Sequence, residues 1–309
     1  MLLIIIHYAL FSLTLILTKL ILKCCGSIFY IGARFGLAGA LMMAYQYAWT
    51  KERFHIKKEH FWIFTQITVF GIYITYIIRF WGFQFMDSAK TMFLFNLAPF
   101  ATALFSYFLL NERMSRKQWI GLFIGFIGFI PILMTSSSAE KSAGEAFLIS
   151  WPEIAVLASV VSQSYTWILI RILMREASYS STMINGLSMF IGGIGALLTA
   201  PFFEGIYPVT NTMEFLVLLI LVTVIGSIVC QNLYAYLLTI YTATMLSFAG
   251  FVSPFFAAFY GWLWLNETTT WQFYASSIIV FIGLWLFYQD ELKYIQRSDT
   301  IKVSEVIES

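Results

Sequence analysis

Charged residues and cysteines are scarce in this sequence. Only 11% of the 309 residues are charged and 60% are hydrophobic, whereas roughly one quarter is charged in an ordinary soluble domain. Of the three cysteines, two are neighbours and the third lies inside an apolar run, so there is neither a disulfide framework nor metal-ligand spacing. A net charge of +2 without a continuous basic face gives no indication of a nucleic-acid partner. The composition predicts a protein whose solvent is a lipid bilayer.

Motifs for nucleotide hydrolysis and for other catalysis are also missing. The sequence has no G-x-x-x-x-G-K-[ST] phosphate-binding loop, no H-E-x-x-H, no G-x-S-x-G and no histidine paired with a carboxylate inside an apolar run. These absences exclude an ATP-driven pump on this chain and leave no candidate catalytic residue. We therefore expect a protein that is not an enzyme and that uses no cofactor and no metal ion.

Apolar windows long enough to cross a membrane recur along the whole chain. About 20 helical residues cross a hydrocarbon core that is ~30 Å thick. The windows are continuously apolar, which predicts helices and not the alternating strands of a barrel. The expected fold is an all-α integral membrane protein with ten spans at 2–22, 28–49, 61–83, 88–110, 118–134, 153–173, 180–203, 213–238, 242–265 and 271–288.

The basic residues of the loops predict the orientation of these spans. Short cytoplasmic loops carry an excess of Lys and Arg. With the N-terminus inside, twelve of the eighteen basic residues fall on the cytoplasmic side, and only Lys23 and Lys141 fall in external loops. Both termini are therefore predicted to be cytoplasmic, as in a multi-pass protein of a bacterial inner membrane.

The sequence repeats itself at an offset of 155 residues. The matched positions are Pro99 and Pro254, Asn111-Glu112 and Asn266-Glu267, and Gly128 and Gly283. Five spans per copy is an odd number, so the second copy must cross the membrane in the opposite sense to the first. We predict a first repeat at 1–134, an external linker at 135–150, a second, inverted repeat at 151–290 and a cytoplasmic tail at 291–309.

Polar residues inside the predicted spans are candidates for the wall of a central cavity. Tyr76 and Arg79 are three residues apart, as are their repeat equivalents Gln231 and Tyr234, so each pair shares one helix face. In lipid, a polar face turns toward a cavity or a partner helix. Interfacial tyrosines and helix–helix hydrogen bonds are an equally open alternative. Further candidates for this wall are Asn96, Gln163, Tyr165, Trp167 and Asn185.

Four basic residues, Lys19, Arg34, Arg79 and Lys90, fall inside predicted spans near their outer ends. Their position opposes the general excess of positive charge on the cytoplasmic side. One hypothesis is a basic external vestibule or gate that attracts a carboxylate or phosphate, with Arg79 and Arg34 as the preferred residues. The alternative is that these side chains extend to the outer interface or bind loop carbonyls.

The repeated residues indicate shared mechanics. Pro99 and Pro254 each lie mid-span and are expected to bend their helices, in a gating or an architectural role. Glu112 and Glu267 follow the ends of the fourth and ninth spans, where a carboxylate can satisfy exposed amides at a helix start. Small-residue spacing, as in Gly121 and Gly125, predicts close helix packing, within the monomer or in a homodimer.

These motifs resemble the drug/metabolite transporter superfamily, specifically its EamA-type ten-span branch, over nearly the whole chain. The resemblance rests on Lys19, Arg34, the stretch 88–128 with its Pro and Asn-Glu pair, and the matching stretch 242–283. Lys90 departs from the pattern, which has a small residue there, and Arg79 is unusual at the end of the third span. The resemblance implies a secondary transporter, an exporter or exchanger, that moves a small molecule by alternating access through a central cavity.

The outer cations and the dense aromatics suggest the class of substrate. An amino acid or an amino-acid-derived compound would suit a cationic clamp and aromatic walls, and a compound like S-adenosylmethionine fits both. A nucleotide-sugar or phosphate-ester antiporter is the alternative within the superfamily, and a lipid flippase, channel or scaffold is the alternative outside it. Since no acidic residue sits near mid-span, uniport or exchange is the simpler mechanism.

Overall fold

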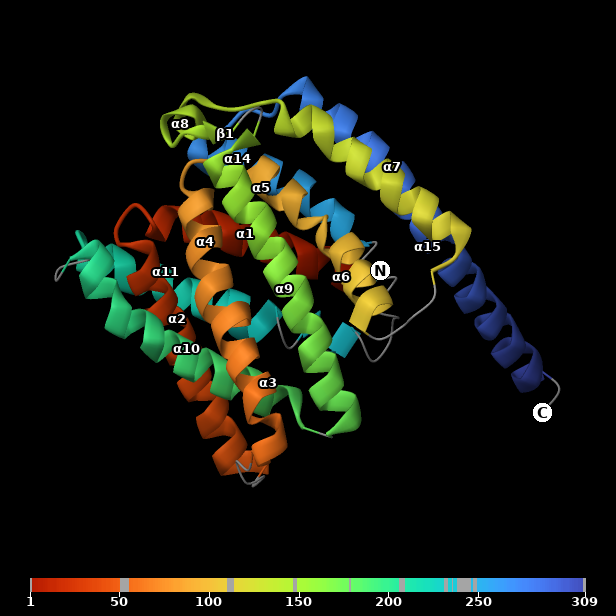
Figure 1. The fold of residues 1–309 in the computed structure, drawn as a ribbon, viewed down its shortest axis with the longest axis horizontal. Helices are drawn as coiled ribbons and strands as arrows, with labels where there is room; N and C mark the ends of the chain where they lie inside the picture. Colours follow the sequence, from red (N-terminus) through yellow and green to blue (C-terminus); the bar gives the residue numbers. More distant parts are fainter. Residues whose placement is uncertain are drawn as a thin grey trace.

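The computed structural model describes residues 2–50, 56–109, 114–146, 149–177, 179–205, 209–230, 233–234, 236–237, 246 and 249–307 (Figure 1). Of the predicted site residues, Glu112 and Gln231 lie outside the described residues. Almost all described elements are helices, and the two strands form one short antiparallel pair, β1 (Glu145–Ala146) with β2 (Ile149–Ser150). The predicted all-α class is confirmed.

The helices of the N-terminal half follow the predicted spans closely. They are α1 (Leu2–Ile21), α2 (Ser27–Tyr45) with the π-helical η1 (Gln46–Thr50), the 3₁₀ turn η2 (Lys58–His60), α3 (Phe61–Gln66), the π-helical η3 (Ile67–Ile74), α4 (Thr75–Phe83), α5 (Ser88–Phe95), α6 (Ala98–Leu109) and α7 (Arg116–Leu133). The short α8 (Ser138–Ser142) belongs to the connection between the halves.

The C-terminal half contains a corresponding series of helices. They are α9 (Trp151–Glu176), α10 (Ser181–Glu204), α11 (Thr212–Val222), the π-helical η4 (Thr223–Cys230), the 3₁₀ turn η5 (Gly250–Val252), α14 (Ser253–Leu265) and α15 (Trp271–Ile307). The π-helical η3 and η4 occupy nearly equivalent positions in the two copies, and each contains the matched glycine, Gly71 or Gly226. A π-helical stretch inside a longer helix is rare and frequently lies at a functional site.

Eight described helical stretches are long and apolar enough to cross a membrane. They are Leu2–Ile21, Ser27–Ala48, Lys58–Phe83, Ser88–Leu109, Arg116–Leu133, Trp151–Met174, Thr182–Glu204 and Trp271–Gln289. Shorter apolar helices at Thr212–Ser227 and Gly250–Leu265 lie where the eighth and ninth spans are expected, next to gaps in the described residues. The count of ten spans therefore stays a prediction.

Local sequence explains where several helices begin and end. Ser115 with Gln118, and Ser150 with Glu153, form reciprocal capping boxes that start α7 and α9. A helix end is explained in the same way: α14 ends at Asn266, whose φ of 54° lies in the left-handed region that asparagine tolerates better than most residues. The second Asn-Glu pair thus has a structural reason, because the turn at Asn266 ends the helix directly before Glu267.

The two halves are interleaved, because most helices pack on the other half. Helix α1 packs against α14, α11 and η4, and α9 in the same way packs against α6, α4 and η3. Helix α2 pairs with α10, α5 with α14, and α7 with α15, the last pair lying side by side in Figure 1. At the repeat offset, the pair α1–α14 is equivalent to α9–α6 and α1–η4 to α9–η3, while the two members of α2–α10 and of α7–α15 are equivalent to each other, as expected for an inverted repeat.

Glycines allow the closest of these pairings. A β-carbon at Gly283 would lie 2.5 Å from the backbone nitrogen of Gly125, so α7 and α15 touch backbone to backbone. A β-carbon at Gly193 of α10 would likewise lie 2.3 Å from the backbone nitrogen of Gly36 in α2. The small-residue pattern is thus used within the chain, and it gives no support for a homodimer.

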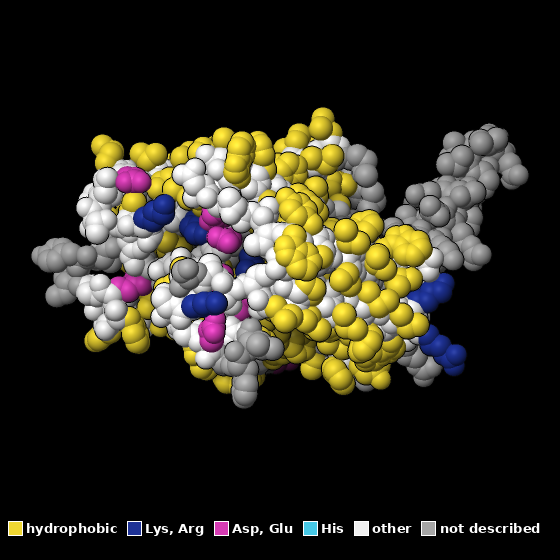
Figure 2. All heavy atoms as spheres, turned by 90° about the horizontal axis from the view of Figure 1, so that it is seen from above, with side chains coloured by type: hydrophobic (Ala, Val, Ile, Leu, Met, Phe, Trp, Pro, Cys, Tyr) yellow, Lys and Arg dark blue, Asp and Glu magenta, His cyan; other side chains and the backbone are white. Residues whose placement is uncertain are grey.

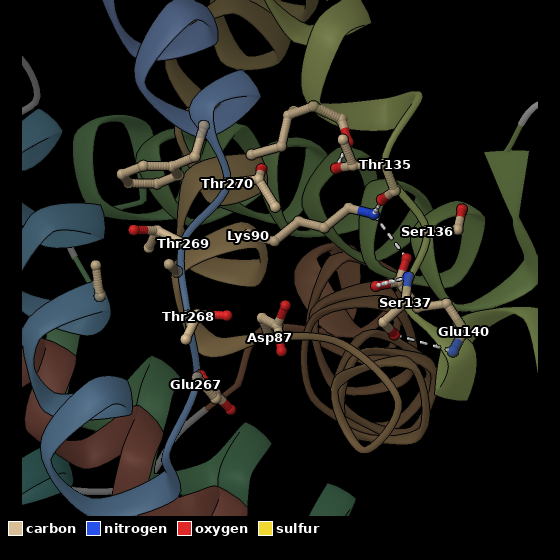
Figure 3. Close-up of a pocket in the computed structure, with 14 residues that line it drawn as sticks. Asp87, Lys90, Thr135, Ser136, Ser137, Glu140, Glu267, Thr268, Thr269 and Thr270 are labelled. Atoms are coloured by element: carbon tan, nitrogen blue, oxygen red, sulfur yellow. Dashed lines mark hydrogen bonds and ion pairs between the residues drawn. The ribbon is translucent and has the colours of Figure 1, made fainter.

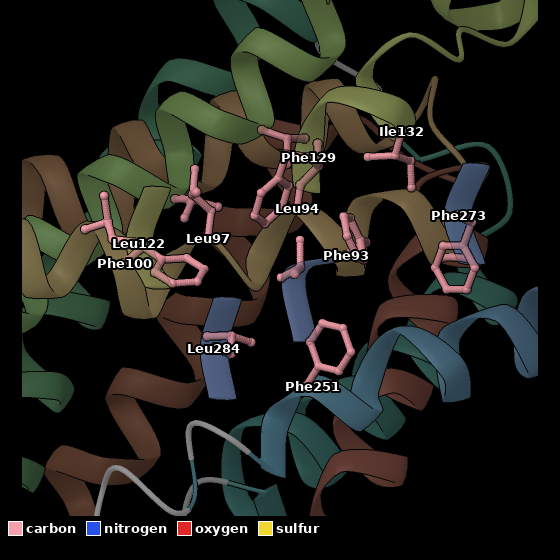
Figure 4. Close-up of a cluster of buried hydrophobic side chains, with 14 of the residues drawn as sticks. Phe93, Leu94, Leu97, Phe100, Leu122, Phe129, Ile132, Phe251, Phe273 and Leu284 are labelled. Atoms are coloured by element: carbon pink, nitrogen blue, oxygen red, sulfur yellow. The ribbon is translucent and has the colours of Figure 1, made fainter. Parts of the chain in front are cut away.

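A buried aromatic and aliphatic cluster joins the two halves. Phe93 and Phe100 of the fourth span contact residues from both sides of the repeat, with Phe93 at 6.0 Å from Phe273 and Phe100 at 5.8 Å from Phe287 between ring centroids. Figure 4 shows Phe93, Phe100 and Phe273 together with other members of this cluster. The helical path is interrupted directly before each matched proline, after Phe95 in one copy and at η5 in the other.

Candidate functional site

Aromatic rings and two arginines meet in the interior between α2, α4 and α5. Phe35 lies 4.4 Å from Tyr76 between ring centroids, Tyr76 lies 5.5 Å from Phe80, and Phe80 lies 5.3 Å from Tyr30. Spacings of this size are those of interacting rings. We call the whole set the arginine–aromatic cluster: Tyr30, Arg34, Phe35, Tyr76, Arg79, Phe80 and Phe95.

Arg79 is held on all sides by the protein. Its Cζ lies 4.9 Å from the ring centroids of both Tyr76 and Phe95. Its Nε donates a hydrogen bond of 3.1 Å to the hydroxyl of Ser159, a fully buried residue of α9. Guanidinium groups commonly stack on aromatic faces in this manner. The structure thus brings the predicted pair, Tyr76 and Arg79 of α4, together with Phe95 of α5 and Ser159 of α9.

Arg34 is held more loosely than Arg79. One terminal nitrogen donates a hydrogen bond of 2.9 Å to the Tyr30 hydroxyl, and its Cζ lies 5.5 Å from the Phe35 ring centroid. Its Nε is buried and has no hydrogen-bond partner among the described residues. A β-carbon at Gly226 would lie 2.8 Å from the other terminal nitrogen, so the bare glycine of η4 makes room for the guanidinium.

Neither arginine forms an ion pair with a carboxylate in the described part of the chain. Two cations without counter-ions are costly in a low-dielectric interior. An anionic group supplied by a ligand would lower that cost, and it could use the unpartnered Nε of Arg34. The cluster therefore combines flat apolar surfaces with a demand for negative charge.

Side-chain exposure changes along one face of α9. Val156, Val160, Gln163, Trp167 and Met174 follow one another at helical intervals and so share a face. Val156 and Val160 are 0% and 2% exposed, Gln163 is half-buried, and Trp167 and Met174 are 50% and 45% exposed. Trp167 and Met174 are thus exposed toward the end of α9 that is predicted to be cytoplasmic, whereas Thr166 and Ile170, on the side of α9 that carries Ser159, are buried.

Two predicted wall residues carry unused polar atoms near the cluster. Asn96 follows Phe95 at the break between α5 and α6, and its Nδ2 has no partner among the described residues. Gln163 lies one turn beyond Ser159 on α9, and its Oε1 is likewise unpartnered. Buried polar groups in native proteins are normally hydrogen-bonded, so each unsatisfied atom is a candidate contact for water or a ligand.

Three further predicted wall residues lie apart from the cluster. Tyr165 donates its hydroxyl to Gln66 and packs 5.7 Å from Phe105, on another side of α9. Tyr234 packs 5.3 Å from the ring of His7 on α1. Asn185 lies near the start of α10, the helix that pairs with α2. The sequence does not separate these from the cluster residues, because all are isolated polar groups in apolar spans.

At the outer end predicted from loop charges, Glu267 joins the two halves. It forms an ion pair with Lys19 of α1 and accepts a hydrogen bond of 2.8 Å from the backbone nitrogen of Ser88, the first residue of α5. Lys19 also donates to the Met86 carbonyl at 2.6 Å. A carboxylate at a helix start satisfies free amides and favours the helix dipole. Glu267 thus holds α5 from the other half of the chain.

Lys90 is the centre of a second ion cluster at the outer end. Its Nζ lies 2.6 Å from carboxylate oxygens of both Glu140 and Glu153 and also donates to the Thr135 carbonyl. The side chain of Lys90 is only 6% exposed, and those of Glu140 and Glu153 are 1% and 0% exposed. Lys90, like Lys19, is thus neutralised within the protein, and the vestibule hypothesis stays a prediction for its preferred residues, Arg34 and Arg79.

A small pocket lies between these two ion clusters. It has a volume of about 200 Å³, and Figure 3 shows Asp87, Lys90, Glu140 and Thr268 on its walls. Burial first, and then the carboxylates of Glu267 and Glu140, raise the pKa of Asp87, partly opposed by Lys19 and Lys90. Figure 2 shows acidic and basic side chains intermingled over this part of the surface and apolar side chains over α7 and α15.

A third contact closes the outer end on the side of α2. Glu204, at the end of α10, accepts hydrogen bonds from the backbone nitrogens of Ile28 and Phe29 at 2.6 and 2.9 Å. The neighbouring loops also meet, since Thr210 donates its backbone N–H to the Cys24 carbonyl at 2.8 Å. Sequence reasoning missed Glu140, Glu153 and Glu204, because their partners come from distant parts of the chain.

The sequence is similar to known transporters over nearly the whole chain. Residues 1–134 and 150–289 match the EamA-like transporter family. An S-adenosylmethionine/S-adenosylhomocysteine transporter of Chlamydia muridarum (strain MoPn / Nigg) is 29% identical over 294 residues, which cover 94% of this chain and 92% of that protein. The transporter of the same description from Chlamydia trachomatis serovar L2 is also 29% identical, over 94% of this chain and 89% of its own.

A crystal structure with 17% sequence identity shares the fold. It superposes with a TM-score of 0.61 and covers 92% of this chain and 94% of its own. Sequence identity at that level supports the helical architecture alone.

Proposed function

This chain belongs to the EamA-like transporter family, and on that premise we propose that it exchanges S-adenosylmethionine and S-adenosylhomocysteine, or a closely similar amino-acid derivative, across the membrane. The observation that carries the proposal is the arginine–aromatic cluster without a carboxylate counter-ion. An adenosyl amino acid offers a flat ring for the aromatic surfaces and a carboxylate for an arginine. The full-length similarity to two transporters of that description supports the same substrate.

The structure also suggests which state of a transport cycle it represents. Glu267, Glu204 and the partners of Lys90 hold the outer end together, while the side chains of Trp167 and Met174 are about half exposed toward the other end of α9. We interpret this as an inward-facing state, in which the substrate would enter or leave a central cavity on the cytoplasmic side. Release of the outer ion pairs would then be needed to form the outward-facing state.

The proposed location is the inner membrane of a bacterium, with both termini in the cytoplasm. The excess of Lys and Arg in the loops on that side is what supports this orientation. We also propose that the chain has no catalytic activity of its own. Within the described residues, no group of three or more His, Cys, Asp and Glu side chains could hold a metal ion.

Counterflow in proteoliposomes tests the proposed exchange. The purified protein is reconstituted with unlabelled S-adenosylhomocysteine inside, and uptake of radiolabelled S-adenosylmethionine is measured. We expect uptake that depends on the internal ligand, because an exchanger returns faster when loaded. Uptake that is independent of the internal ligand would indicate a channel.

Parallel liposomes separate the proposed substrate from the alternative within the superfamily. They contain UDP-galactose or a sugar phosphate in place of the adenosyl compound. We expect neither to stimulate uptake, since the cluster presents rings and hydroxyls and only two arginines. Stimulation by these anions, with none by adenosyl compounds, would reject the proposal.

A further inference from the structure

Arg34 has the only described guanidinium nitrogen in the spans that is buried and unused. Its Nε has no hydrogen-bond partner, whereas the Nε of Arg79 donates to Ser159. The other side of the Arg34 guanidinium lies against Gly226, which is inside the π-helical η4. A buried donor that carries positive charge and has no acceptor is strongly unfavourable unless something binds there.

The surroundings of Gly226 contain two more unused polar atoms. Thr223 precedes Gly226 by three residues and Ser227 follows it directly, and their side chains are buried with residue exposures of 2% and 6%. The hydroxyl oxygens of both have no hydrogen-bond partner among the described residues. Hydroxyls in membrane helices usually bond back to a carbonyl one turn earlier, as Thr18 does with Thr14. The π-helical η4 that approaches Arg34 through Gly226 therefore carries two unpartnered hydroxyls close in sequence to that contact.

Arg79, unlike Arg34, has a partner for its Nε as well as for its ring-facing surface. Its Cζ lies 4.9 Å from the ring centroids of both Tyr76 and Phe95, and its Nε and one terminal nitrogen donate to Ser159. A side chain that is stacked and hydrogen-bonded in this way is fixed in place, and it fixes Tyr76 and Phe95 in turn. Little of it is left to bind a carboxylate directly.

We propose that Arg34, Thr223 and Ser227 form the subsite for the carboxylate of the substrate, and that Arg79 is a positioning residue that holds the aromatic surface. The subsite would take a carboxylate because that group offers two acceptor oxygens, one for the guanidinium and one for a hydroxyl. This assignment rests on the proposed function, since it names the part of the same substrate that each arginine serves. It also explains the bare glycine, because a side chain at position 226 would displace the guanidinium.

The test compares two ligands that differ only in the carboxylate. S-adenosylmethionine and its decarboxylated analogue are titrated against the full-length protein in detergent, and the ratio of their dissociation constants is the readout. We expect wild-type protein to prefer the carboxylate form by at least about tenfold, as for a hydrogen bond to a charged group. Arg34→Gln should bring that ratio close to one.

Arg79→Gln is the matched variant. It should weaken binding of both ligands by a similar factor and leave their ratio as in the wild type, because it changes the ring surface and not the carboxylate contact. Ser227→Ala and Gly226→Ala keep Arg34 and should each reduce the ratio in part. These two variants keep the test valid if Arg34→Gln fails to fold.

The outcomes separate the two proposals. Wild-type protein that binds neither adenosyl ligand overturns the proposed function and this assignment with it. Wild-type protein that binds both, with an unchanged ratio in Arg34→Gln, Ser227→Ala and Gly226→Ala, overturns the assignment alone. If the ratio of dissociation constants falls to about one in Arg79→Gln but stays at the wild-type value in the Arg34 and Gly226 variants, then Arg79 binds the carboxylate.

Discussion

The four basic side chains within the spans divide into two pairs once their neighbours are known. Lys19 and Lys90 lie against carboxylates at the outer end and are neutralised there. Arg34 and Arg79 lie against rings and hydroxyls and have no carboxylate partner among the described residues. The lysines therefore belong to the architecture of the outer end, and the arginines belong to the proposed substrate site.

Removal of Lys90 should destabilise the protein strongly. Lys90→Met leaves Glu140 and Glu153 buried without their cation, which costs about 3–5 kcal/mol for a broken buried pair. Thermal unfolding in detergent measures the loss. The double variant Lys90→Met with Glu140→Gln should recover part of it, and Lys141→Met, at an exposed position of α8, should have almost no effect. Equal melting temperatures for Lys90→Met and Lys141→Met would contradict the ion cluster.

Asp87 should make stability depend on pH. Its pKa is raised in the folded protein, first by burial and then by Glu267 and Glu140. Its contribution is therefore fully present below the usual pKa of aspartate, about 3.9, and is lost as the pH rises through the raised native pKa. Asp87→Asn should be more stable than the wild type at neutral pH and no more stable at about pH 4.

Melting temperatures across this pH range check the prediction for Asp87. Glu145→Gln is the control, because Glu145 is an exposed carboxylate in β1 of the same outer connection. A pH-independent difference between Asp87→Asn and the wild type would refute a raised native pKa.

At the scale of helices, the closest contact is between α7 and α15. Gly283→Ala places a methyl group 2.5 Å from a backbone nitrogen of the neighbouring helix, and backbone cannot move aside as a flexible side chain can. Overpacking of this kind costs about 1–3 kcal/mol. A lower melting temperature in detergent, with the helical circular dichroism unchanged, is the expected result.

Gly36→Ala is the matched control for that contact. No atom lies within 4 Å of a β-carbon at Gly36, so the substitution removes only the flexibility of glycine. It should leave stability unchanged or raise it by up to about 1 kcal/mol. If Gly36→Ala and Gly283→Ala melt alike, the backbone contact between α7 and α15 is wrong.

For the whole molecule, the central prediction is that the interior is reached from the cytoplasmic side. Trp167→Cys should react with a membrane-impermeant thiol reagent added on that side, whereas Val160→Cys on the same face of α9 should be protected. The rates should differ by at least about tenfold, because thiol chemistry requires access to the reagent. The three native cysteines are buried and are replaced in the background protein.

Reaction from the external side would contradict both the orientation and the inward-facing state. S-adenosylmethionine should slow the reaction of Trp167→Cys if it fills the interior or shifts the protein toward a closed state.

The sequence by itself determined the properties that depend on local composition or on repetition. Hydropathy windows predicted the spans, loop charges predicted the orientation, and the 155-residue offset predicted two copies, an arrangement with which the equivalent pairs α1–α14 and α9–α6 agree. The repeated motifs also identified the family, which the comparison confirmed. These features can be predicted from sequence because every segment that crosses the bilayer must be an apolar helix of similar length.

Only the tertiary structure decided which polar groups meet. Lys19 pairs with Glu267, 248 residues away, and Lys90 pairs with Glu140 from the connection between the halves. In sequence, Lys90 and Arg79 look alike as basic residues inside apolar helices, yet one is neutralised and the other stacks on rings. The difference arises because ion pairs and ring contacts depend on side chains brought together by packing, whereas insertion into a membrane depends on each segment alone.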